Sequence, residues 1–234
     1  MNTGIPRRRS APRRARSTGQ SLVEFMIVVP VFLFLVLVIF QMVLIYRAKT
    51  TLDYATLEAA RMGAVKGADK AAMKRGLIRG LMPLYANSAG AGGAAAAWGR
   101  AKADIDLGRA ATIDIISPTR RAWNDHKERQ YNGRFALPND SLAFRDQRVG
   151  SSGMNVQDAN ILKIKVTYHY PLVVPFVDRV MRGDSDYVKP SGFTDPGKVR
   201  MSNRFGVWSH YRIPIESYAV VRMQTPIYNQ NVLP

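Results

Sequence analysis

The sequence predicts an α+β protein, in which a long N-terminal transmembrane helix continues into a domain with an antiparallel sheet. Three observations lead to this prediction. An uncharged apolar run covers residues 25–46, a helical repeat of small and apolar residues follows it, and alternating strand patterns occupy the second half of the chain. The chain of 234 residues is long enough for one compact domain plus an anchor.

The apolar run FMIVVPVFLFLVLVIFQMVLIY extends from Phe25 to Tyr46 and carries no charge. As a helix it covers roughly 33 Å, enough for the ~30 Å hydrocarbon core of a bilayer. It lacks the polar face of a buried helix in a soluble protein. Its one strongly polar residue is Gln41, either a hydrogen-bond partner for a neighbouring helix in an assembly or a tolerated polar residue in the outer half of the span. We expect Pro30 to kink the helix or loosen its first turn, and Tyr46 to anchor the interface.

The charges that flank this run predict its orientation. Residues 1–19 contain six arginines and no acidic residue, whereas a short basic pair, Arg47 and Lys49, follows the run. Because basic residues concentrate on the cytoplasmic side, the N-terminus is predicted to be cytoplasmic and the C-terminal domain to lie across the membrane. A secretory signal peptide fits less well, since the run is too long and no small-residue cleavage site follows it. The topogenic arginines are Arg7, Arg8, Arg9, Arg13, Arg14 and Arg16.

Composition excludes several kinds of site. The chain has no cysteine, so a disulfide framework, a cysteine nucleophile and a cysteine-ligated zinc site are ruled out. The net charge is +17, but the basic residues beyond the N-terminal cluster are scattered and form no basic helix with interleaved aromatics. We therefore expect no nucleic-acid partner.

Motifs for catalysis and metal binding are missing from the sequence, including the Walker A, H-E-x-x-H, G-x-S-x-G and G-x-G-x-x-G patterns. The histidines His126, His169 and His210 are far apart and lack ligand spacing, and we interpret His169 as an ordinary sheet residue. Asp184 and Asp186 lack the further oxygen ligands of a calcium loop, so we interpret them as a solvated turn. We expect no enzymatic activity, no cofactor and no metal.

Residues 19–25, with the sequence GQSLVEF, precede the core of the apolar run. An acidic side chain such as Glu24 is costly at the edge of a membrane helix. Cleavage after Gly19 would give Gln20 a new ammonium group, and Glu24, four residues further along a helix, could face it. The carboxylate also suits the positive helix N-terminus. Glu24 alone could equally be an interfacial residue, but its combination with Gly19, the basic leader and Phe25 favours a processing site.

The pattern G-x-x-x-x-E-F before a long apolar helix resembles the class III signal of type IV pilins and pseudopilins. Within that class, residues 17–65 resemble the TadE-like family of tight-adherence (Tad, Flp-type) pilus systems, through the Gly-Gln-x-x-Val-Glu-Phe start, the early Pro30 and the alanine-rich helix over residues 51–65. The resemblance implies cleavage by a prepilin peptidase between Gly19 and Gln20, with Glu24 acting in processing or in the register between subunits. Gln20 stands where major pilins usually have Phe, which leaves N-methylation of the new terminus open.

The resemblance implies a pseudopilin or minor pilin, a structural component of a Tad pilus assembly and secretion system. The implied partners are the lipid bilayer, a prepilin peptidase, other Tad pilins or pseudopilins and the inner-membrane assembly platform. The implied location is the bacterial inner membrane with a periplasmic domain, and entry into the filament stays open. Two alternatives remain. One is an uncleaved, membrane-anchored periplasmic scaffold or binding protein, and the other is a membrane-tethered enzyme, which a pocket with converging polar groups in residues 66–234 would support.

The chain is thus divided into a basic leader (residues 1–19), a transmembrane helix with its extension (20–65) and a periplasmic α+β domain (66–234). We expect the three strands to form an antiparallel sheet packed on the long helix, in an order that the sequence does not give, a layout that suits a pilin-like subunit. The expected elements after residue 65 are helices over 69–85 and 94–107 joined by a glycine- and alanine-rich loop (88–93), strands over 111–117, 160–170 and 213–224, an irregular insertion (118–158), a short helix (171–181) and a turn-rich loop (184–203).

Overall fold

The computed structural model of the chain describes residues 18–86, 90–106, 110–174, 177, 180, 199–203, 206–210 and 212–234. The elements in chain order are α1 (Thr18–Val65), α2 (Lys70–Tyr85), α3 (Ala91–Asp106), β1 (Ala111–Ser117), α4 (Arg120–His126), β2 (Glu128–Arg129), β3 (Phe135–Ala136), the 3₁₀ turn η1 (Leu142–Phe144), α5 (Val156–Ala159), β4 (Ile161–Pro171), β5 (Val199–Asn203), β6 (Gly206–His210), β7 (Arg212–Arg222) and the 3₁₀ turn η2 (Gln230–Val232).

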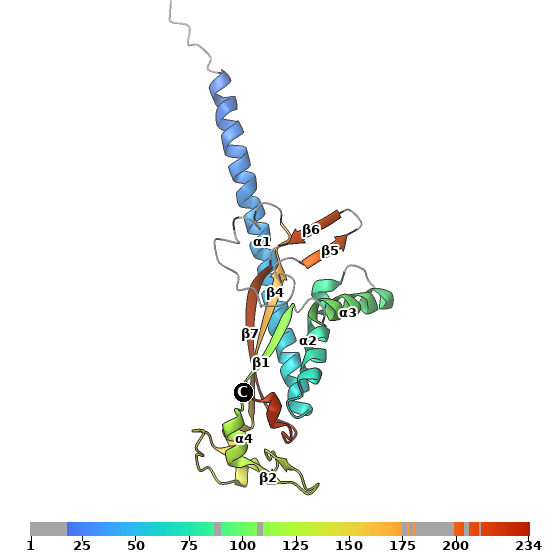
Figure 1. The fold of residues 1–234 in the computed structure, drawn as a ribbon. Helices are drawn as coiled ribbons and strands as arrows, with labels where there is room; N and C mark the ends of the chain where they lie inside the picture. The colour runs from blue at the N-terminus through green and yellow to red at the C-terminus, as the bar shows by residue number, and fades with distance from the viewer. Residues whose placement is uncertain are drawn as a thin grey trace, which may run out of the picture.

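Helix α1 is a single element of 48 residues. Its N-terminal half projects away from the rest of the protein, and its C-terminal half runs through the domain (Figure 1). The prediction that the membrane helix continues to about Val65 is confirmed. Pro30 lies in the exposed half, and the helix continues through it without a break.

The end of α1 is fixed by a turn that also binds the C-terminal segment. Gly67 adopts a positive φ of 63°, and the Ala68 amide donates to the Gly63 carbonyl over 2.8 Å, the long bond of a Schellman cap. The second bond of that motif is replaced, because the Gly67 amide donates to Thr225 Oγ1 (2.9 Å) and this hydroxyl donates to the Ala64 carbonyl (3.1 Å). One side chain therefore completes the cap and holds the C-terminal segment against α1.

Helix α2 turns back along α1 and approaches it closely through two glycines. A Cβ atom on Gly80 would lie 2.4 Å from Ala55 Cα, and one on Gly76 would lie 3.0 Å from Ala59 Cα. Small residues on both helices therefore let the two backbones approach each other. Between these two glycines, Leu77 is completely buried in the core, which contributes about 2 kcal/mol of hydrophobic stabilisation.

The main sheet has the order β1-β4-β7 and is antiparallel throughout, so the last strand pairs with the central one. Residues of β4 alternate as predicted: Leu162, Ile164 and Val166 are completely buried, whereas Lys163 is exposed. The buried face packs on α1, where Leu52 belongs to the same core. The predicted α+β class, with an antiparallel sheet on the long helix, is confirmed.

A buried polar network joins α2, α3 and the sheet near the end of β4. Arg212 at the start of β7 forms an ion pair with Asp104 of α3 (Nη2 to Oδ1, 2.8 Å) and donates to the His169 carbonyl over 3.0 Å. The Tyr85 hydroxyl lies 2.6 Å from Asp104 Oδ2 and 2.8 Å from the Tyr168 hydroxyl. Burial raises the pKa of Tyr85 and raises that of Tyr168 to about 12. Both phenols therefore stay protonated and act as hydrogen-bond donors or acceptors within the core.

Three predicted segments differ from the structure. The insertion over residues 118–158 is ordered into α4, β2, β3, η1 and α5, at the end of the domain farthest from the start of α1 (Figure 1). Trp123 Nε1 holds it by donating to the Ile227 carbonyl over 2.7 Å. Residues 91–93 belong to α3 instead of a loop although two of them are glycines, and the four alanines at 94–97 that follow favour helix. Residues 199–203 form β5, which pairs with β6, whereas residues 184–198 lie outside the described residues. In the expected helix over 171–181, Pro171 ends β4 and residues 172–174 are not helical, while residues 175, 176, 178, 179 and 181 lie outside the described residues.

Candidate membrane anchor and processing site

The residues of the GQSLVEF motif lie together in the first turns of α1. The helix begins at Thr18, so Gly19 and Gln20 are helical, and Glu24 follows Gln20 by about one turn. The side chains of Glu24 and Phe25 are exposed. The helical spacing that the processing prediction needs is therefore present in the backbone. Cleavage itself stays a prediction, and the six topogenic arginines lie outside the described residues.

The N-terminal half of α1 presents a continuous apolar surface. Within the described chain, the segment Leu22–Val65 is the one helix long and apolar enough to cross a membrane, and no residue of its most apolar stretch is buried. A soluble monomer rarely leaves such a patch in contact with water. The large apolar residues that are at least half exposed here are Leu22, Val23, Phe25, Met26, Ile27, Val28, Val31, Phe32, Leu33, Leu35, Ile39, Phe40, Met42 and Val43. This half of α1 is a membrane anchor.

Gln41 has a role that sequence reasoning missed. The residue is completely buried, and its Oε1 accepts a hydrogen bond from the Val174 amide over 3.0 Å. Within the described chain, its partner is the segment after β4, and a contact of Gln41 with a neighbouring helix in an assembly stays a prediction. The sequence does contain a second uncharged apolar run, residues 171–177 (PLVVPFV), which pointed to a segment able to pack beside the apolar half of α1. A single sequence, however, does not show which amide would meet Gln41.

Polar contacts attach α1 to β7 just beyond the apolar run. Lys49 Nζ donates to the Glu216 carbonyl over 2.8 Å and pairs with Asp53, and the Ser217 hydroxyl donates to Asp53 Oδ1 over 2.7 Å. Tyr46 is 72% exposed one turn earlier, a position that suits an interfacial aromatic residue. The anchor and the domain are therefore joined by side-chain contacts in addition to the continuous helix.

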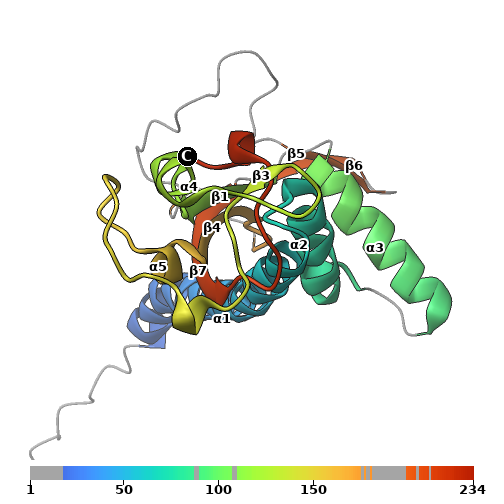
Figure 2. The ribbon, with the colours of Figure 1, turned by 90° about the horizontal axis from the view of Figure 1, so that it is seen from below.

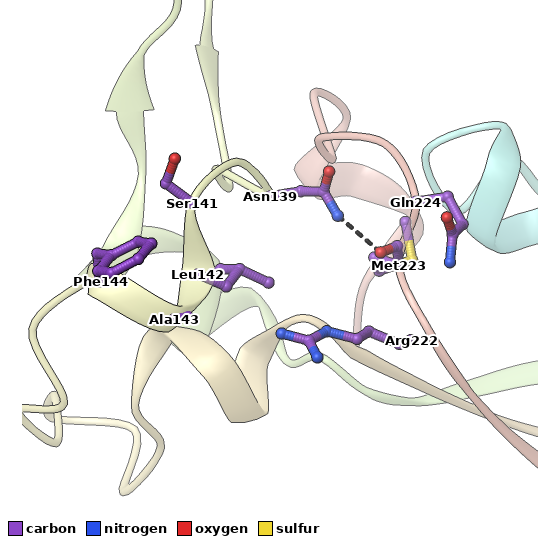
Figure 3. A pocket seen from close by; sticks show the side chains of 8 residues that line it. All are labelled: Asn139, Ser141, Leu142, Ala143, Phe144, Arg222, Met223 and Gln224. Atoms are coloured by element: carbon purple, nitrogen blue, oxygen red, sulfur yellow. Dashed lines mark hydrogen bonds between the residues drawn. The ribbon is translucent and has the colours of Figure 1, made fainter.

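A cavity of about 390 Å³ lies between residues 139–144, in the segment around η1, and residues 222–224 at the end of β7 (Figure 3). In it, Asn139 points toward the Met223 carbonyl and donates a hydrogen bond to it over 2.6 Å, while Phe144 is 93% exposed. Apart from the Arg222 guanidinium, no ionisable side chain lines this cavity within the described residues. The cavity therefore offers no pair of acid and base for catalysis.

A second cavity, of about 370 Å³, is lined by several charged residues that form ion pairs or hydrogen bonds with neighbouring side chains and backbone. Arg145 pairs with Glu128, and the Asp125 carboxylate accepts from the Ser151 hydroxyl over 2.7 Å, which lowers the pKa of Asp125. His126 Nε2 lies 2.9 Å from the Met154 carbonyl oxygen. These contacts hold loops together, and they explain the charged lining without a ligand.

The histidines and acidic residues considered from the sequence do not converge in the described chain. His126 lies in α4, His169 in β4 and His210 in β6. Burial, with a contribution from Arg212, lowers the pKa of His169. In the part of the chain that the structure describes, no group of three or more His, Cys, Asp or Glu side chains could hold a metal ion. Asp184 and Asp186 lie outside the described residues.

In the view from below, the C-terminal half of α1 lies beside α2 and next to β7 (Figure 2), while its N-terminal half carries the motif and the apolar surface. Residues 19–61 match the model of the family described as TadE-like protein. Comparisons with curated proteins and with solved structures found no match. The matched residues begin at the motif glycine and include both the anchor and much of the helix that packs in the domain. Over residues 19–61, the chain is therefore similar to the TadE-like family.

Proposed function

We propose that this protein is a pseudopilin or minor pilin, a structural component of a Tad (Flp-type) pilus assembly and secretion system. The observation that supports this role is the TadE-like match over residues 19–61, which falls on a helix that is apolar and exposed in its first half and packed in its second. The apolar surface of such a helix can exchange its contacts with lipid for contacts with similar helices, because both surroundings are apolar.

In this proposal the leader lies in the cytoplasm and the domain in the periplasm. A prepilin peptidase cuts between Gly19 and Gln20, and the new ammonium group of Gln20 lies one helical turn from Glu24. The pair neutralises two charges that would each be costly in a low-dielectric environment. Glu24 then sets the axial register of α1 against neighbouring pilins or the assembly platform. The proposed role needs no catalytic step.

The proposal is tested by deleting the gene in its host and counting surface pili by electron microscopy. The full chain is expected to restore piliation, and Glu24→Ala is expected to fail at equal membrane abundance. Glu58→Ala is the matched control, because Glu58 also lies on α1 but contacts Arg79 of α2 at 3.8 Å, away from the motif. Unchanged piliation in the deletion strain would contradict the proposal.

A further inference from the structure

We infer that the segment Leu172–Val174 lies within the bilayer leaflet on the domain's side, packed on α1, and that Gln41 supplies the hydrogen bond that water would otherwise give to the Val174 amide. Lipid acyl chains cover the outer side of this segment. The inference requires only that α1 crosses the membrane, and it holds whether or not the protein joins a pilus.

The depth of Gln41 follows from the dimensions of the helix. The charged Glu24 places the start of the hydrocarbon core near Phe25. At 1.5 Å per residue, a core of ~30 Å needs about 20 residues and extends to the region of Leu44. Tyr46 then lies in the interface. Gln41 is three residues before Leu44, so it lies roughly 5 Å inside the hydrocarbon edge.

The burial pattern of α1 shows that protein covers one side of the helix at this depth. Phe40 and Met42 are 61% and 50% exposed, whereas Gln41 between them is completely buried. The covering segment includes Leu172, which is also completely buried, and Val174, whose amide donates to Gln41 Oε1 over 3.0 Å. The segment after β4 therefore reaches a level of α1 that the helix dimensions place inside the bilayer.

The chemistry of the segment fits this location. Residues 171–177 carry no charged or polar side chain, and Val173 is 53% exposed. Non-helical backbone is stable at membrane depth only when its amides are bound by protein, since an unsatisfied group there costs several kcal/mol. Gln41 Oε1 accepts the hydrogen of the Val174 amide, whereas Gln41 Nε2 is buried and has no hydrogen-bond partner within the described chain. An apolar exposed side chain and a satisfied amide are both features expected of a segment in contact with acyl chains.

The absence of cysteine makes the depth directly measurable. Single-cysteine variants Val173→Cys, Val43→Cys and Tyr54→Cys of the full chain are labelled with a small environment-sensitive fluorophore in phosphatidylcholine–phosphatidylglycerol vesicles. Val43 and Tyr54 are each 58% exposed on α1, and they serve as the lipid and water references. Quenching is measured with acyl-chain nitroxide lipids and with aqueous iodide.

We expect the nitroxide lipids to quench the fluorescence of the Val173 label to an extent within about twofold of that for the Val43 label. Iodide is expected to quench only the Tyr54 label strongly. Iodide quenching of Val173 equal to that of Tyr54 would overturn the inference, and so would protection from both quenchers, which would mean that another protein surface covers the segment. Loss of acyl-chain quenching at Val43 would instead overturn the membrane anchor itself.

Gln41→Met tests the positioning role, because methionine has a similar length and is not a strong acceptor. In this background the acyl-chain quenching of the Val173 label is expected to fall at least twofold, while that of the Val43 label stays unchanged. Unchanged quenching at Val173 would show that Gln41 does not hold the segment.

Discussion

The close approach of α1 and α2 makes Gly80→Ala a sharp test of the packing in the domain. The added Cβ would lie 2.4 Å from Ala55 Cα and 2.6 Å from Ala55 Cβ, whereas ordinary carbon contacts are about 3.5–4.0 Å. Ala55 Cα belongs to the backbone of a long packed helix, so it cannot move aside as a flexible side chain would. The two helices must therefore separate by about 1 Å.

The energetic effect has two parts with opposite signs. Inserting a methyl group into a packed interface typically costs about 1–3 kcal/mol, and the separation also weakens the contacts of the completely buried Leu77 and Leu81. Alanine also stabilises the helix by up to about 1 kcal/mol relative to glycine, because its helix propensity is higher. We expect a net loss of about 1–2 kcal/mol in the free energy of unfolding, equivalent to a fall in Tm of roughly 3–6 °C for a chain of this size.

The measurement is thermal unfolding of the full chain in detergent, followed by circular dichroism. Gly99→Ala is the matched control, because Gly99 also lies inside a helix but has no described atom within 4 Å of the position that an added methyl group would take. The control is expected to stabilise the protein by about 0.5–1 kcal/mol. An equal gain in Gly80→Ala would refute the close packing of α1 on α2.

Three further changes test the interior. Asp104→Ala leaves the buried Arg212 charge without its partner and is expected to destabilise the protein by about 3–5 kcal/mol in urea titration; a loss below 1 kcal/mol would contradict burial of the pair. Thr225→Val removes the hydroxyl that joins Gly67 to Ala64, with an expected loss of about 1–2 kcal/mol, whereas an unchanged urea midpoint would show that the cap does not need it. The pKa of His169 is lowered from 6.5 by burial and Arg212, so the stability that this group contributes is present above pH 6.5 and is lost as the pH falls through its folded-state pKa. The urea midpoint should therefore fall less between pH 7 and pH 5 in His169→Gln, and an identical fall would contradict the shift.

The elements that the sequence predicted correctly are those with an unambiguous period. Helix α1 follows from an uncharged run joined to a helical repeat, and β4 follows from strict alternation between residues such as Lys163 and Ile164. In both cases the local pattern and the packing favour the same structure. The order β1-β4-β7 did not follow, because long segments separate the strands and alternation does not identify partners.

The errors arise where tertiary contacts outweigh local signals. Residues 118–158 contain turn-forming residues that predict irregular chain, yet Trp123 and the C-terminal segment hold short helices and strands there. Strand β5 was missed because five residues among turn signals carry little periodicity, and it is formed by pairing with β6. Gln41 was recognised as unusual, but its partner, 133 positions further along the chain, could come only from the fold.

The N-terminal sequence of the protein isolated from membranes, with and without a prepilin peptidase, tests the proposed function most directly. The account predicts a mature chain that begins at Gln20 when the peptidase is present, and a precursor that retains the arginine-rich leader when it is absent. An intact leader under both conditions would contradict the pseudopilin proposal and would favour an uncleaved, membrane-anchored scaffold or binding protein.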